Sequence, residues 1–381
     1  MIEVTEKTTF VKLTPLYIIL GLLFLLLSLT QRGIGWGDYT ATVLYFSVPS
    51  VVVGVLFQLY PVLQGIPSKL QALTYLHLLL FLSSFCLYIL ELSFGVPYFL
   101  SSLIYMVYIL FNTRRYSGQV QLFFLVGSVF YLLASYFILV GETNQFLVKH
   151  TLAVGFLLTV SFGGIYLLLP MLQLERLYFS NNIWLHLSFH TFFTIDFLIS
   201  WKRFSFQHIY ISGLLILATL LFHLFILYKT LSRRESPLKG LDPSIRAFLL
   251  SLIMLTTALV VGVLSAGSQD FSILKLHSDV LLYGFFPILT LGASYHIIPF
   301  MLWWKGFAPK LGKEKVPTLK ELFPEKFLEI SLLLISFSLF GMVGSLFLKG
   351  IVQIFFSITY ALGIMLFLLP SLRLSYKFLK A

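Results

Sequence analysis

Histidines and carboxylates inside apolar runs are the residues of this chain that could do chemistry. His277 and Asp279 open the stretch HSDVLLYGFFPILTLGASYHIIP, which ends at Pro299 and is long enough to cross a bilayer as one helix. Ionisable groups at membrane depth are costly, so a span that carries them is a candidate functional site. Imidazole can ligate a haem iron or a metal ion, and a carboxylate can ligate metals or carry protons.

The end of this stretch is repeated upstream. In three apolar runs a glycine stands seven residues before a proline, and the sequences between them are similar: GVLFQLYP, GGIYLLLP and GASYHIIP. The three pairs are Gly54 with Pro61, Gly163 with Pro170, and Gly292 with Pro299. This pattern predicts an internal repeat.

Counting back from the prolines places two histidines at one level of the membrane. His150 stands 20 residues before Pro170, and His277 stands 22 residues before Pro299, where the first copy has Tyr39. At about 1.5 Å per residue both imidazoles lie roughly 30 to 33 Å from their prolines. We therefore expect His150 and His277 to border one cavity near the outer leaflet.

The composition is that of an integral membrane protein. Hydrophobic residues make up 59% of the 381 residues and charged residues only 11%, which is far from a soluble domain. The single cysteine, Cys86, excludes an intramolecular disulfide and a thiolate metal cluster. The net charge of the chain is +11, and the basic residues that produce it lie in loops between apolar runs. This distribution indicates a membrane surface and not nucleic acid as the partner.

Twelve apolar runs of spanning length predict an all-α membrane protein with twelve transmembrane helices. We number these spans one to twelve in chain order. They lie near residues 13–30, 39–63, 70–94, 96–112, 118–140, 146–171, 183–200, 208–230, 245–267, 274–304, 326–348 and 350–374.

The repeat falls on spans two, six and ten, so the single domain 1–381 is expected to contain three pseudo-symmetric sets of four helices. These sets cover residues 13–112, 118–230 and 245–374. Of the 26 Lys and Arg residues, 20 lie at the termini or in loops after even-numbered spans, which predicts that both termini are cytoplasmic. The basic segment 305–325 is then a cytoplasmic loop that could meet anionic lipid or an acidic partner.

The histidine-to-proline pattern of spans six and ten resembles the catalytic subunit of haem-copper oxidases, that is, subunit I of cytochrome c oxidase and the large subunit of nitric oxide reductases. The resemblance is carried by KHTLAVGFLLTVSFGGIYLLLP and by residues 274–304. It implies a fold like that subunit, non-covalent haem b, and a bacterial or archaeal inner membrane. It also implies a cytochrome c or cupredoxin-like partner subunit and a small gaseous ligand.

The resemblance assigns roles to individual positions. His277 matches the ligand of the high-spin haem, and Asp279 stands where that family has the histidine of the low-spin haem. His150 matches a ligand of the copper or non-haem metal opposite the high-spin haem. The remaining pair of metal-binding histidines would fall near Ser200 and Trp201, so two ligands of a three-histidine copper site are missing.

The residues themselves leave alternatives open for the outer level. Asp279 and Asp196 together with His150 could form a mixed site for iron, manganese or zinc, because imidazole and carboxylate suit these metals. With Glu91 near the outer end of span three, the same groups could instead line a hydrated or proton-conducting cavity.

A second group of histidines lies deeper. His186 and His190 are four residues apart on span seven, a spacing that can chelate a metal. His190 is expected about 15 Å below the level of His150, so the two cannot serve one ion. An inner site with His77, His223 or His296 is one possibility, and hydrogen bonds between helices are the other.

Three functional hypotheses follow. The first is a divergent haem-copper oxidase-like protein that binds haem b and acts in respiratory electron transfer, or in reduction or sensing of oxygen or nitric oxide. The second is an active terminal oxidase or nitric oxide reductase with unorthodox ligands. The third is a non-enzymatic protein for haem or metal handling, transport or assembly on the same scaffold.

Overall fold

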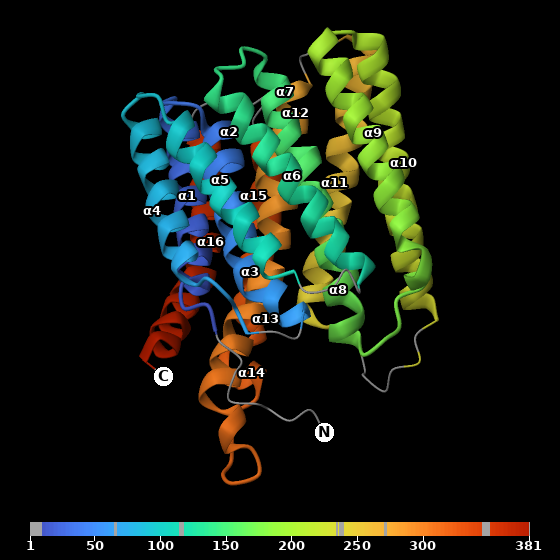
Figure 1. The fold of residues 1–381 in the computed structure, drawn as a ribbon. Coiled ribbons are helices and arrows are strands. Elements are labelled where there is room, and N and C mark those ends of the chain that lie inside the picture. Colours follow the sequence, from blue (N-terminus) through green and yellow to red (C-terminus); the bar gives the residue numbers. More distant parts are fainter. Residues whose placement is uncertain are drawn as a thin grey trace. The chain divides into compact units, whose positions relative to one another are not determined.

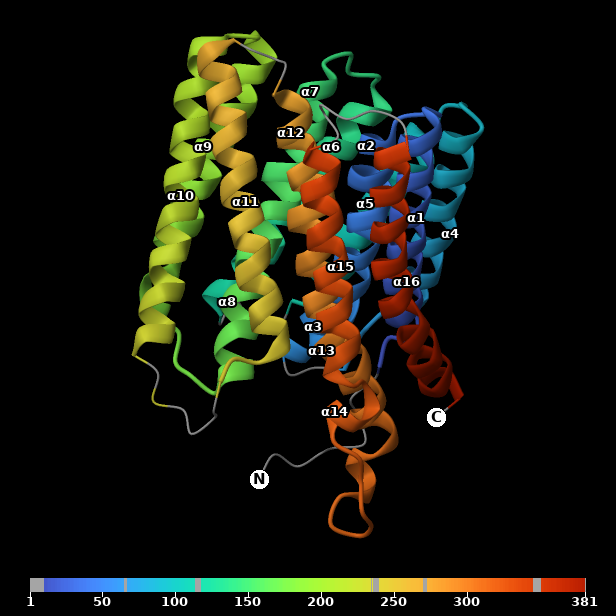
Figure 2. The same ribbon diagram turned by 180° about the vertical axis from the view of Figure 1, so that it is seen from behind.

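A computed structural model describes residues 10–64, 67–113, 118–233, 235, 240–269, 273–344 and 351–380 (Figure 1). The described residues form helices joined by short connections, and no named strand occurs among them (Figure 2). Ten helical spans in this part of the chain are long and apolar enough to cross a membrane. The prediction of an all-α membrane protein is therefore confirmed.

A helix occupies each of the twelve predicted apolar runs. Nine runs hold one helix each: α1 (Thr14–Ile34), α4 (Ala72–Ile89), α5 (Gly95–Phe111), α6 (Gln119–Leu139), α9 (Ile183–Arg203), α10 (Phe206–Ser232), α11 (Pro243–Ser268), α15 (Glu325–Gly344) and α16 (Ile351–Lys380). Helices α5 and α15 are not among the ten candidate spans. Twelve membrane crossings thus stay a prediction.

The three repeated spans are the other runs, and each contains a π-helical segment. They are α2 (Tyr39–Ala41), η1 (Thr42–Ser47) and α3 (Val48–Leu63); α7 (Gln145–His150), η2 (Thr151–Leu158) and α8 (Thr159–Gln173); and α12 (Leu274–Asp279), η4 (Val280–Phe285) and α13 (Phe286–Gly306). Every π segment begins 19 residues before the repeated proline. The repeat therefore extends from the sequence to the backbone geometry. Such π-helical turns are rare in proteins, and those that occur are often found at functional sites.

The repeated glycines allow close helix packing. A Cβ at Gly163 would lie 2.7 Å from the Cβ of Phe123 on α6, and a Cβ at Gly292 would lie 2.7 Å from the Cβ of Ala247 on α11. At Gly54 a Cβ would overlap Tyr17 on α1. Each repeated span therefore uses its glycine against the helix that precedes it in the sequence, which explains why this position is glycine.

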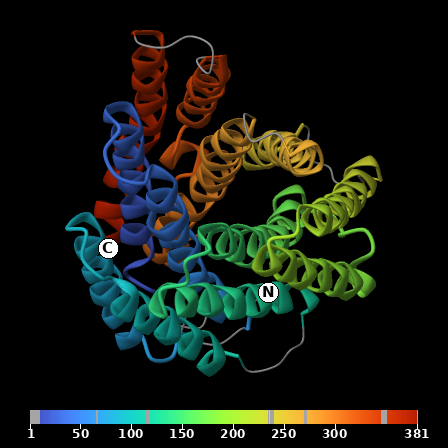
Figure 3. The same ribbon diagram turned by 90° about the horizontal axis from the view of Figure 1, so that it is seen from above.

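The chain divides into two compact units. Unit 1 comprises Met1–Leu13, Leu56–Leu238 and Ala266–Gln269, and unit 2 comprises Thr14–Val55, Lys239–Ser265 and Asp270–Ala381. Figure 3 shows the helices from above, with α9 and α10 side by side in yellow-green. The division falls inside α3, so the three sets of four helices stay a prediction.

The basic segment after α13 is built from two short helices, η5 (Ala308–Lys310) and α14 (Leu319–Leu322). The indole Nε1 of Trp303, near the end of α13, donates to the carbonyl of Pro317 at 2.7 Å. This hydrogen bond ties α13 to the residues just before α14. Thr318 and Glu321 form a reciprocal cap on α14. The Thr318 N–H and hydroxyl hold the pKa of Glu321 below its ordinary value.

Candidate functional site

His277 lies in the last turn of α12, just before the π segment η4. Its Nδ1 is 2.7 Å from the carbonyl oxygen of Ala258 on α11, and because a carbonyl only accepts, Nδ1 carries the proton. A Cβ at Gly262 would lie 2.7 Å from the same Nδ1, so this glycine makes room for the ring. The orientation is thereby fixed, and Nε2 is the nitrogen that an iron would take.

His150 ends α7 and also directs its Nδ1 to a backbone carbonyl, that of Phe146, at 2.7 Å. The indole of Trp201 stacks on the imidazole with ring centroids 4.9 Å apart, and Phe197 meets it edge-on at 5.3 Å. Trp201 stands where the resemblance expects a metal-ligating histidine. An aromatic ring therefore covers a face of His150 at the place predicted for a ligand.

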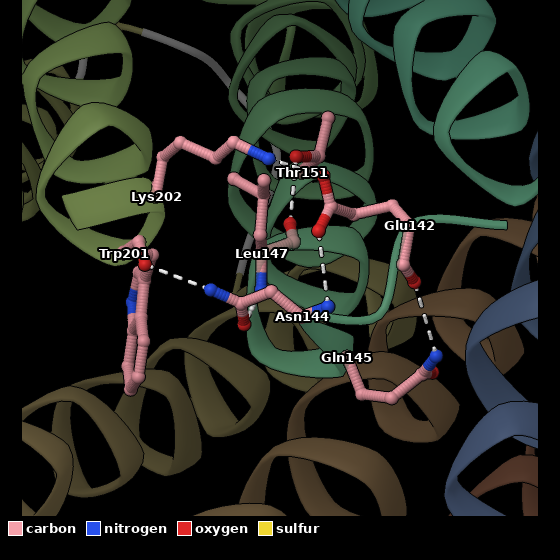
Figure 4. Close-up of polar contacts among 7 residues, drawn as sticks. All are labelled: Glu142, Asn144, Gln145, Leu147, Thr151, Trp201 and Lys202. Atoms are coloured by element: carbon pink, nitrogen blue, oxygen red, sulfur yellow. Dashed lines mark hydrogen bonds and ion pairs between the residues drawn. The ribbon is translucent and has the colours of Figure 1, made fainter. Parts of the chain in front are cut away.

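Polar contacts at the start of α7 hold this corner together (Figure 4). The side chain of Asn144 accepts from the N–H of Leu147 at 3.1 Å and donates to the carbonyl of Trp201 at 2.8 Å. The Lys202 ammonium donates to Glu142 at 2.5 Å. Lys202, followed by the N–H of Asn144, holds the pKa of Glu142 below its ordinary value.

Asp279 is paired with an arginine in unit 2. Nη2 of Arg32, on α1, lies 2.6 Å from Oδ2 of Asp279, and the two side chains are only 2% and 0% exposed. The guanidinium lies over the ring of Tyr283, 5.5 Å from its centroid, and Tyr39 stacks on the same ring at 6.3 Å. The carboxylate at the position predicted for a second haem ligand or a metal ligand is instead neutralised by Arg32.

The mixed metal site of His150, Asp196 and Asp279 stays a prediction, because Asp279 belongs to unit 2 and the other two residues belong to unit 1. Across the described ranges, no group of three or more His, Cys, Asp or Glu side chains could hold a metal ion. Asp196 and Glu91 are both exposed. A buried carboxylate without an opposite charge is strongly destabilising, and Arg32 supplies that charge for Asp279.

The deeper histidines are joined to neighbouring helices by hydrogen bonds in unit 1. His186 on α9 accepts from the hydroxyl of Tyr166 at 3.0 Å through Nδ1 and donates to the carbonyl of Thr219 at 3.1 Å through Nε2. The roles follow because a carbonyl only accepts. Of the two alternatives for this residue, the structure therefore shows interhelical hydrogen bonds.

His190 lies one turn further along α9. Its Nε2 is 3.0 Å from the hydroxyl of Thr159, and its Nδ1 is 3.3 Å from that of Thr219. Since the Thr219 hydroxyl donates to the carbonyl of Ile216 at 2.7 Å, it accepts the proton of Nδ1. Thr159 is nine residues past His150 in the same span, so the two imidazoles lie at different depths, in agreement with the sequence.

His223 on α10 completes a cluster of three buried imidazoles. Its ring centroid is 5.7 Å from that of His186, and neither nitrogen has a hydrogen-bond partner among the described residues. The ring of Phe162 contacts all three histidines, at centroid distances of 5.0, 5.1 and 4.4 Å for His186, His190 and His223. Phe162 thus packs against all three imidazoles, and the described residues include no group of three or more His, Cys, Asp or Glu side chains that could hold a metal ion.

The other two histidines considered for an inner site pack elsewhere. His77 on α4 stacks on Phe81 at 5.7 Å and meets Phe57 edge-on, and His296 on α13 stacks on Phe300 at 5.8 Å.

Sequence reasoning missed Arg32 because it was counted with the loop residues. Its place at the end of an apolar span was the available signal.

Comparisons with known proteins leave the family open. No model of a known protein family matches the chain. The chain is 29% identical over 353 residues to an uncharacterized protein of Aquifex aeolicus (strain VF5), a match that covers 88% of this chain and 90% of that protein.

Proposed function

We propose that this chain is a membrane protein of haem-copper oxidase-like build that binds one haem b through Nε2 of His277. Its work is then respiratory electron transfer, or reduction or sensing of a small ligand such as oxygen or nitric oxide. The observation that carries the proposal is the contact of 2.7 Å between Nδ1 of His277 and the carbonyl of Ala258.

This contact matches what haem ligation asks of a histidine. A ligating imidazole nearly always donates its other N–H to a carbonyl, carboxylate or water, which fixes the tautomer and makes the ligand nitrogen more basic. The absence of a side chain at Gly262 leaves room for the ring, and His277 keeps part of its surface accessible. Haem b would supply one-electron chemistry and an iron that can take a diatomic ligand.

The proposal includes no second metal. An active oxidase or nitric oxide reductase would need a metal close to the haem iron, and the groups predicted for it are engaged otherwise. Trp201 stacks on His150, and Arg32 neutralises Asp279. The active-enzyme hypothesis would therefore need ligands other than those that the sequence suggests.

A second candidate is a non-enzymatic role in haem or metal handling, transport or assembly. It is favoured by the buried pair of Arg32 and Asp279, because paired charges inside a membrane span often mark a polar pathway. Under this hypothesis the purified protein carries no stoichiometric haem.

Optical spectroscopy separates the two candidates. We expect reduced-minus-oxidised and carbon monoxide difference spectra of the purified protein to show one high-spin haem b. The signal should disappear in His277→Ala and persist in His208→Ala, whose side chain is exposed on α10. Haem that is retained in full by His277→Ala would contradict the assigned ligand, and a wild-type protein without haem would favour the second candidate.

A further inference from the structure

Helix α16 of unit 2 is longer than a bilayer crossing requires. It is one of the candidate membrane spans, and it runs over 30 residues from Ile351 to Lys380. Its first charged residue is Arg373. The uncharged part before Arg373 is roughly 33 Å long, close to the hydrocarbon thickness of a bilayer. The end of α16 therefore lies at the level of the lipid headgroups.

One side of this end is held against α13. Leu374 and Phe378 are only 4% and 1% exposed. The ammonium of Lys305, near the end of α13, donates to the carbonyl of Phe378 at 3.0 Å and lies 4.7 Å from the centroid of its ring. These contacts fix the rotation of the helix end about its axis, so the side chains that point outward are defined.

The outward side of α16 is an apolar stripe that continues past Pro370. Its six side chains are between 41% and 62% exposed, and at about 100° per residue they lie within about 100° of one another around the helix. They are Leu362, Met365 and Leu369 before the proline, and Leu372, Tyr376 and Leu379 after it. An exposed apolar side of a membrane span contacts lipid, so this lipid-facing surface extends to the end of the helix.

Basic side chains flank the last part of the stripe. Arg373, Lys377 and Lys380 are exposed, are the only charged residues of α16, and lie within about 60° of one another beside the stripe. None of the three forms an ion pair with a described residue. The ammonium of Lys380 lies 4.4 Å from the ring centroid of Tyr376. Basic side chains that run along apolar surface in this way place their charges among the headgroups.

The two stripes together define the partner. A helix with an apolar stripe beside a basic one is typical of segments that lie in a membrane interface. An acidic soluble protein would complement the charges alone. A leaflet that contains anionic lipid complements both stripes, because acyl chains contact the apolar residues and lipid phosphates attract the cations.

We propose that the end of α16 is a binding site for anionic phospholipid. Arg373, Lys377 and Lys380 hold the phosphate groups, and the apolar side chains that follow Pro370 contact the acyl chains next to the headgroups. The site enriches anionic lipid around α16 in the leaflet that this end reaches. This inference is independent of haem binding.

The basic segment after α13 provides a charge-matched control. Lys310, Lys313 and Lys315 are exposed and lie between the start of η5 and α14. Figures 1 and 2 show that this orange segment extends further from the membrane-spanning part of α13 than the end of α16 does. Replacement of these three lysines removes the same charge without touching the proposed site.

Quenching by spin-labelled lipid tests the site. In a Cys86→Ser background, Leu372→Cys is labelled with bimane and the full chain is placed in liposomes of equal parts phosphatidylglycerol and phosphatidylcholine, one of which carries a spin label on its acyl chain. We expect labelled phosphatidylglycerol to quench at least about twofold more than labelled phosphatidylcholine. Ile358→Cys, 56% exposed and about 22 Å from Arg373, should give a ratio near one.

Glutamine variants assign the selectivity to the basic stripe. Arg373→Gln/Lys377→Gln/Lys380→Gln should bring the ratio at Leu372→Cys close to one, and Lys310→Gln/Lys313→Gln/Lys315→Gln should leave it unchanged. Equal ratios at Leu372→Cys and Ile358→Cys, or the same loss in both glutamine variants, would overturn the proposal. Quenching at Ile358→Cys with none at Leu372→Cys would also overturn it, because another protein chain would then cover the stripe.

Discussion

Spans six and ten share a backbone pattern and carry different polar chemistry. Each has a π segment that begins 19 residues before its proline, and His150 and Asp279 stand at the same position, 20 residues before it. In unit 1, the polar groups packed against span six are neutral imidazoles and hydroxyls. In unit 2, span ten instead holds a carboxylate that is paired with Arg32.

This difference separates the structural features that the repeat determines from the chemistry that individual side chains determine. The π segment and the glycine contact recur in all three repeated spans, so they belong to the scaffold. The chemistry depends on the side chains that neighbouring helices bring. A buried charge needs an opposite charge, whereas a neutral imidazole needs only hydrogen-bonding groups such as Tyr166 and Thr219.

The largest expected effect comes from breaking the ion pair. Arg32→Leu leaves Asp279 buried without its cation and should lower the free energy of unfolding by about 3 to 5 kcal/mol. The double variant Arg32→Leu/Asp279→Leu should recover most of this loss. Equilibrium unfolding in mixed detergent micelles measures both, and a single variant as stable as the wild type would contradict the account.

Substitution of two adjacent glycines tests the scaffold. Gly163→Ala places a Cβ 2.7 Å from that of Phe123 and should destabilise by about 1 to 3 kcal/mol. Gly164 has no such neighbour within 4 Å, so Gly164→Ala should be neutral or stabilise by up to about 1 kcal/mol. Equal unfolding free energies for the two variants would show that the contact is not tight.

Substitutions in the cluster of His186, His190 and His223 should lower the free energy of unfolding less than loss of the ion pair does, and by amounts that differ between the residues. His186→Phe removes the acceptor of the Tyr166 hydroxyl and should lower the free energy of unfolding by about 1 to 2 kcal/mol. His223→Phe removes no hydrogen bond to a described residue and should change stability by less than about 1 kcal/mol. The reverse order in the same unfolding assay would refute this assignment of partners.

The smallest effect is expected from the exposed pair in Figure 4. Because Lys202 holds the pKa of Glu142 below its ordinary value of 4.5, the pair stabilises the fold at neutral pH. This contribution should be lost as the pH falls below 4.5 through the pKa of the folded state. Melting curves between neutral pH and pH 3 should show a smaller fall in Lys202→Gln than in the wild type, roughly at the limit of detection.

Much of the scaffold could be predicted from the sequence. Apolar runs located the helices, and the spacing of glycine and proline identified the repeated spans, because both signals are local. The π segments were not predicted, since hydropathy is the same for α and π turns. The pair of Arg32 and Asp279 joins residues 247 positions apart and depends on how helices pack, which no local pattern reveals.

Chemical rescue of the His277 site tests the central claim most directly. His277→Gly should be purified with and without added imidazole, and the haem b content of each preparation measured against protein. If Nε2 of His277 is the axial ligand, the variant should be depleted of haem, and free imidazole should restore it toward one haem per chain. A variant that retains haem without imidazole, or a wild type that contains none, would contradict haem ligation by His277.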